Sequence, residues 1–326
     1  MEKGQRMNAI ERLNEGVLKK GPLLAELDPK IERVLALYEK EVRAKDLFYS
    51  YSINPDKCDD QVKQLVLRQY CFEFIDAVKE TLTAIKVNIK TFRDAGMEST
   101  FWEAVSYAKL NNLFVIVESK SSDDEKMSLK DAFRFLYKES EVDAIVVNPY
   151  SNPKVLARLI DRAINSDKGI FIVIKSKYDT TSTEKEKYNM SFTTELDLED
   201  MYQEVKQWGR YCSIWTTEKN KYPIVAAMIT SIPVRKKMQE IRNALKEIFI
   251  VVAEDERNSE LKLWVTEDFS GTLVSSSKLM FPKDIHPWSL YSRMDWDKAT
   301  EYEANREKNA LLEENKKMLP MYQKFF

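Results

Sequence analysis

Leu113-Phe114-Val115-Ile116-Val117 is the stretch that decides the fold. A short run of apolar, mostly β-branched or aromatic residues is typical of a strand that is buried on both faces. The run stops at Glu118, where a polar segment begins. Strands of this kind belong to parallel sheets whose faces are covered by helices, so the stretch predicts an α/β protein.

Similar runs recur along the chain, and amphipathic helical patterns separate most of them. Eight strands alternating with helices predict a (β/α)8 barrel of the TIM type, because a closed barrel fits a count of eight better than an open sheet does. We expect the strands at 47–53, 84–89, 113–117, 142–147, 169–174, 224–228, 248–252 and 272–274.

The two ends of the chain lie outside this predicted barrel. We expect an N-terminal helical extension at 1–46, the barrel at 47–280, and a C-terminal aromatic and charged helical extension at 281–326. One face of the first extension is apolar, which indicates one or two helices. Its residues are Ile31, Val34, Leu35, Tyr38 and Val42.

The second extension combines an aromatic group with a highly charged helix at 297–318. Trp288, Tyr291 and Trp296 are of the type enriched at interface hot spots. Packing of the same side chains over the barrel's own helices is the alternative. The charged helix is either a solvated face or a surface for a partner.

Composition limits the classes of partner and compartment. The net charge of -2 in 326 residues gives no reason to expect nucleic acid. No apolar run reaches the roughly 18 residues that a membrane-spanning helix needs. The three scattered cysteines, Cys58, Cys71 and Cys212, fit a reducing compartment. We therefore expect an intracellular protein, cytoplasmic or mitochondrial, and not a secreted one.

Two residue counts restrict the chemistry. His286 is the single histidine, so we expect no histidine-based metal site, and acid–base chemistry must use Lys, Asp, Glu or Tyr. There are only seven glycines, well below the average share of about 7 %. Sites that bind phosphate through backbone N–H groups usually need glycine for close approach, and this chain offers few.

Short motifs follow the expected strands in a characteristic order. In that order they resemble the orotidine 5'-monophosphate decarboxylase family, in its longer bacterial-type branch, over about residues 47–280. That family carries Gly-Leu-Asp-Pro-Asp after strand one, Lys-Pro-Asn after strand two and Asp-x-Lys-x-x-Asp after strand three. The corresponding stretches here are 52–56, Lys86-Val87-Asn88, 118–123, 143–150, Lys175-Ser176 and 275–278.

The resemblance implies a barrel that decarboxylates a nucleotide monophosphate without a cofactor. Its implied catalytic array is Lys86, Glu118, Lys120 and Asp123, with Lys120 as the proton donor. Fixed charges of this kind act by stabilising the transition state more than the ground state. The family's counterpart of Asp123 reaches in from a second subunit, which implies a homodimer.

The substrate-binding residues implied by the resemblance are Asn54, Ser176, Arg257 and Lys278. Asn54 replaces the aspartate that holds the ribose, and Lys278 replaces an arginine, which loses its bidentate grip. After strand seven the family's glycine-rich phosphate loop is replaced by the acidic stretch 253–258. Three acidic residues there oppose a phosphate dianion, and Arg257 is the cation among them.

These departures lead to three hypotheses. The leading one is a non-catalytic, decarboxylase-derived barrel that serves as a structural or interaction subunit of a larger protein assembly, for which a mitochondrial complex is one setting. The second is an active, divergent decarboxylase of pyrimidine biosynthesis. The third is a barrel for another ligand, with the acidic loop selecting a cation or a basic group.

Overall fold

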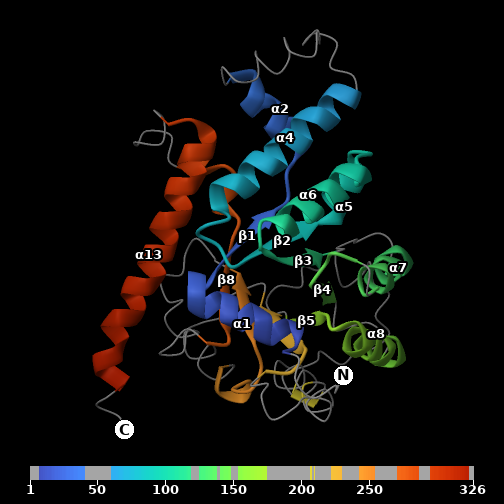
Figure 1. Ribbon diagram of the computed structural model, residues 1–326, viewed down its shortest axis with the longest axis vertical. Helices are drawn as coiled ribbons and strands as arrows, with labels where there is room; N and C mark the ends of the chain where they lie inside the picture. The colour runs from blue at the N-terminus through green and yellow to red at the C-terminus, as the bar shows by residue number, and fades with distance from the viewer. Residues whose placement is uncertain are drawn as a thin grey trace, which may run out of the picture.

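The computed structural model describes residues 7–40, 60–118, 125–137, 140–147, 153–174, 206–207, 209, 222–229, 242–253, 270–285 and 294–322. Eight parallel strands close into a barrel in sequential order, which confirms the predicted (β/α)8 fold (Figure 1). The strands are β1 (Leu23–Leu27), β2 (Ala84–Asn88), β3 (Phe114–Glu118), β4 (Ala144–Val147), β5 (Gly169–Ile174), β6 (Val225–Ile229), β7 (Ile250–Ala253) and β8 (Thr272–Ser276).

Helices cover the outside of the barrel and its amino-terminal end. They are α1 (Ala9–Lys20), α2 (Ile31–Lys40), α4 (Asp60–Val78), α5 (Ile89–Asp94), α6 (Glu98–Leu110), α7 (Glu125–Phe135), α8 (Pro153–Ser166), α12 (Pro282–Ile285) and α13 (Trp296–Tyr322), with the 3-10 helix η3 (Lys278–Met280). Strands β2 to β8 overlap the predicted runs and differ from them by a few residues at their ends. The predicted bounds of β5 agree with the structure at both ends.

The first barrel strand is not where the sequence pattern placed it. Strand β1 lies between β2 and β8, with Leu24 beside Ala84 on one side and Ser275 on the other. The expected first strand, 47–53, lies outside the described residues, and its expected place in the barrel belongs to β1. The predicted boundary between residues 46 and 47 is therefore wrong, because the barrel already includes β1 within the predicted N-terminal extension.

The barrel interior is filled by apolar side chains, and helix α1 closes its amino-terminal end. Ile10, Leu13 and Val17 of α1 belong to the same buried cluster as inward residues of β1 to β8. Side chains of α1 also bind the backbone at the starts of strands. Asn8 Nδ2 donates to the Tyr222 carbonyl (2.8 Å), and Gly271 N donates to Asn14 Oδ1 (2.8 Å). The open end of the barrel is therefore the carboxyl end.

The C-terminal segment forms the helix α13, which overlaps the helix predicted at 297–318, and it packs beside α4 (Figure 1). Trp296 is only 3 % exposed, and its ring stacks on Tyr70 (4.8 Å between centroids). Of the two interpretations of this residue, packing on the chain's own helices therefore holds, and the interface role does not apply to Trp296. Trp288 and Tyr291 lie outside the described residues.

Within the described part of the chain, no helix combines the length and apolar character required to cross a membrane.

Candidate functional site

Three charged side chains face the barrel interior at its carboxyl end. Side chains alternate between the two faces of a strand, so each residue two positions beyond an inward apolar residue also points inward. Glu26 follows Leu24 on β1, Lys86 follows Ala84 on β2, and Glu118 follows Ile116 on β3. The three charges therefore form one layer directly above the apolar floor of the barrel.

Lys86 lies between the two carboxylates. Its Nζ is 3.0 Å from Glu26 Oε1 and 3.0 Å from Glu118 Oε2. The exposed fractions of the Lys86, Glu26 and Glu118 side chains are 12 %, 24 % and 15 %. Ser275 on β8 donates its hydroxyl to Glu26 Oε1 at 2.6 Å. Three strands that are neighbours in the barrel thus fix the Glu26 carboxylate.

The carboxylates determine the charge of Lys86. Burial alone would lower the pKa of Lys86, but the charges of Glu118 and Glu26 outweigh burial and raise its pKa above the ordinary value. The ammonium is therefore held charged at neutral pH. A lysine in this state is a fixed positive charge and a poor proton donor.

Sequence reasoning missed Glu26 and Asp28 because it placed strand one elsewhere. The end of β1 and the residues after it read Glu26-Leu27-Asp28-Pro29-Lys30, which keeps the Leu-Asp-Pro of the family motif intact. Asp28 is half-buried and accepts a hydrogen bond from the Thr91 hydroxyl. The Leu-Asp-Pro triplet was the available signal, and Glu26 stands where the family motif has glycine.

The structure brings together Lys86 and Glu118 of the predicted catalytic array. Lys278 lies half-buried in η3, directly after β8, at the same end of the barrel. Lys120, Asp123, Asn54, Ser176 and Arg257 lie outside the described residues, so their places in the site stay predictions. Among the residues that the structure describes, no cluster of His, Cys, Asp and Glu could hold a metal ion.

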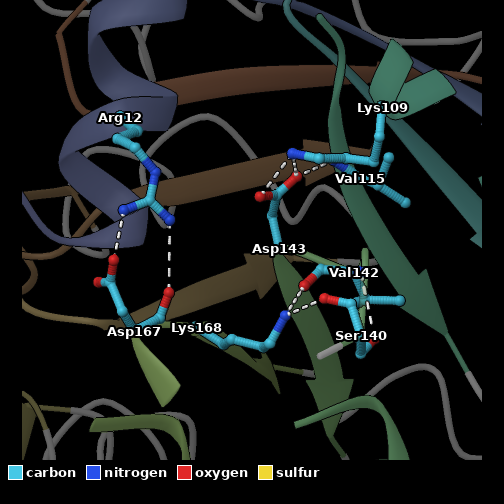
Figure 2. A network of polar contacts seen from close by, with 8 residues as sticks. All are labelled: Arg12, Lys109, Val115, Ser140, Val142, Asp143, Asp167 and Lys168. Atoms are coloured by element: carbon cyan, nitrogen blue, oxygen red, sulfur yellow. Dashed lines mark hydrogen bonds and ion pairs between the residues drawn. The ribbon is translucent and has the colours of Figure 1, made fainter. Parts of the chain in front are cut away.

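A second polar network lies at the opposite, amino-terminal end of the barrel (Figure 2). Lys109 Nζ is 2.7 Å from Asp143 Oδ2, which also accepts a hydrogen bond from the backbone N–H of Val115 (2.9 Å). Lys168 Nζ donates to the Ser140 carbonyl at 2.6 Å. Burial lowers the pKa of Lys168 to about 8, although Asp143 opposes that shift. These contacts join α6 and β3 to the segments before β4 and β5, so the network is structural.

Comparisons with known proteins agree with the fold. No protein-family model and no curated protein matches the chain. Among solved structures, the chain resembles orotidine 5'-monophosphate decarboxylase from Plasmodium berghei, with 15 % identity, a TM-score of 0.66 and coverage of 94 % of this chain and 99 % of that one.

Two further decarboxylase structures give the same result. The Leishmania donovani enzyme has 18 % identity, a TM-score of 0.57 and coverage of 94 % and 98 %. The Methanocaldococcus jannaschii enzyme, solved with the inhibitor BMP, has 15 % identity, a TM-score of 0.51 and coverage of 89 % and 98 %. At these identities the comparisons establish a decarboxylase-like fold over nearly the whole chain, and activity must be argued from the site.

Proposed function

We propose that this chain is a decarboxylase-derived barrel that does not turn over orotidine monophosphate and acts as a structural or interaction subunit of a protein assembly. The observation that carries the proposal is the triad of Glu26, Lys86 and Glu118. The positive charge of Lys86 is compensated by two carboxylates of the same chain, each 3.0 Å away. A lysine saturated in this way offers little attraction to an incoming anion.

Charge at the open end of the barrel supports the same proposal. Two carboxylates, Glu26 and Glu118, contact Lys86, and a third, Asp28, follows β1 at the same end of the barrel. At an effective dielectric constant near 20, each unit charge about 6 Å from a phosphate changes the energy by about 3 kcal/mol. An excess of carboxylates therefore works against a nucleotide dianion. In decarboxylases of this type, the binding energy of the substrate's phosphate helps to drive the reaction, although the phosphate does not itself react.

The second candidate is an active, divergent decarboxylase, and Asp28 is the observation that favours it. Leu27-Asp28-Pro29 matches the Leu-Asp-Pro of the family motif. On this alignment Asp28, and not Asn54, is the counterpart of the aspartate that holds the ribose. Asp28 thus adds a ribose-binding aspartate to Lys86 and Glu118, the two members of the implied catalytic array that lie together at the ends of β2 and β3. On this alternative the chain works as a homodimer that binds a nucleotide monophosphate.

An assay of turnover separates the two candidates. Purified protein is incubated with orotidine monophosphate, and the loss of substrate absorbance is followed beside the Plasmodium berghei enzyme as a positive control. We expect no rate above that of heat-inactivated protein. Turnover that disappears in Lys120→Ala would establish the active enzyme instead.

The subunit role has a separate test. The native protein is purified gently from a cell extract, cytoplasmic and mitochondrial fractions being kept apart, and the size and composition of its particle are measured. We expect a particle larger than a homodimer that contains other proteins in fixed ratio. A protein found only as a free dimer would contradict the subunit role.

A further inference from the structure

We propose that Lys86 and Ser275 form a carboxylate-binding subsite and that Glu26 is its built-in occupant. This inference rests on the proposed function, in which the open end of the barrel no longer receives a nucleotide. The inference names a ligand class for this end of the barrel, a small carboxylate. It also names Glu26 as the residue that excludes such a ligand.

The Glu26 carboxylate is held as a bound ligand would be held. Its Oε1 lies 3.0 Å from the Lys86 ammonium and accepts the Ser275 hydroxyl at 2.6 Å. The two donors come from β2 and β8, the strands on either side of β1. Ser275 is 3 % exposed and the Lys86 side chain 12 % exposed, so both donors are largely removed from water.

A donor pair of this kind is selective for a carboxylate. Hydrogen bonds that join an ammonium to a carboxylate are shorter and roughly twice as strong as bonds between neutral groups. A buried hydroxyl without an acceptor is unfavourable, so Ser275 needs an oxygen nearby. Below the pair, Leu24 and Leu273 form the apolar floor. The two donors therefore face the carboxyl end of the barrel.

Substitution of Glu26 by alanine would empty the subsite without removing either donor. Lys86 would keep Glu118 as a counter-ion, and the net charge of the layer would change from -1 to zero, because the layer of Glu26, Lys86 and Glu118 loses one carboxylate. The vacated volume is that of a short side chain ending in a carboxylate. Formate and acetate match that volume and charge, whereas longer acids would have to extend toward the open end.

The experiment titrates the Glu26→Ala protein with sodium formate against sodium chloride at equal ionic strength. Thermal unfolding and the line width of 13C-labelled formate in NMR spectra are recorded. We expect a saturable rise in the melting temperature and line broadening with formate alone, and neither effect in the unsubstituted protein. Glu26→Gln, which keeps the side-chain volume, should respond like the unsubstituted protein.

Ser275→Ala in the Glu26→Ala background tests the second donor. Loss of one hydrogen bond of about 1–1.5 kcal/mol should weaken formate binding roughly tenfold. If Glu26→Ala does not fold in chloride, refolding with and without formate, and the same titration of Glu26→Ser, provide the readout. Formate that restores folding supports the subsite.

Two results would overturn the inference: a folded Glu26→Ala or Glu26→Ser protein that shows no formate-dependent effect, or an equal effect in the unsubstituted protein. Neither result depends on orotidine monophosphate. Turnover by the unsubstituted protein would refute the proposed function. The formate titration would still support or overturn the subsite, because it compares only the Glu26 variants with the unsubstituted protein.

Discussion

Replacement of Lys86 by methionine should destabilise the protein strongly. Methionine keeps most of the side-chain volume but removes the charge between Glu26 and Glu118. The two carboxylates, 24 % and 15 % exposed, would then face the same space without a counter-ion. The loss therefore includes both ion pairs and a new repulsion.

The magnitude follows from the geometry. At an effective dielectric constant near 20, an ion pair at 3.0 Å has a gross attraction of about 5–6 kcal/mol, so the two pairs together give roughly 11 kcal/mol. Desolvation costs several kcal/mol for each ion and offsets most of this gain. Removing one partner of a buried pair typically costs about 3–5 kcal/mol, because a charge remains buried without compensation. We expect a loss in that range.

The pH dependence of this contribution has a defined sign. The pKa of Lys86 is raised in the folded state above its ordinary value of 10.5. The stability that it contributes is therefore fully present below pH 10.5 and is lost as the pH rises through the folded pKa. In Lys86→Met this contribution is missing at every pH.

The assay is urea unfolding at pH 7, followed by far-UV circular dichroism. Lys63→Met is the matched control, since Lys63 forms an ion pair with Asp60 at 3.1 Å on the exposed side of α4. Exposed pairs of this kind contribute about 0–1 kcal/mol. A Lys86→Met protein that loses no more stability than Lys63→Met would refute the assignment of Lys86 as a buried, doubly paired cation.

Three further predictions concern the scaffold. Trp296→Ala should cost about 3–5 kcal/mol in urea unfolding and alter the near-UV spectrum, because it removes a buried ring stacked on Tyr70; an unchanged midpoint would contradict that packing. Asn14→Ala should cost about 1–3 kcal/mol in the same assay, since the buried N–H of Gly271 loses its acceptor, and a neutral effect would show that α1 does not fix the barrel end. The lowered pKa of Lys168 means that the folded state releases a proton near pH 8 that the unfolded state keeps to 10.5, so this residue makes the urea midpoint rise across that interval. Lys168→Met should flatten the rise, and an identical slope in both proteins would count against the shift.

Most of the fold could be predicted from local sequence. Strands β2 to β8 are short apolar runs whose length and composition indicate burial on both faces. The same logic failed at β1, because Leu23-Leu24-Ala25-Glu26-Leu27 contains no β-branched residue and carries an inward glutamate. The run at 47–53 is richer in aromatic residues and has the higher strand propensity, so propensity alone favoured it over 23–27 as the first strand.

The site shows a different limit of prediction. Lys86 and Glu118 could be found because their motifs follow recognisable strands. Glu26 could not be paired with Lys86 until β1 was placed beside β2, since that contact depends on strand register and spans 60 positions of the chain. Local patterns give the residues of a strand, whereas the partner of a buried charge depends on tertiary structure. The motifs alone therefore miss the second ion pair of Lys86, the one with Glu26.

The measurement that tests the central claim most directly is isothermal titration calorimetry of the unsubstituted protein with uridine monophosphate. A barrel whose lysine is already neutralised by Glu26 and Glu118 should give no binding heat up to millimolar nucleotide. Saturable binding in the micromolar range would show that the protein still receives a nucleotide and would contradict the account.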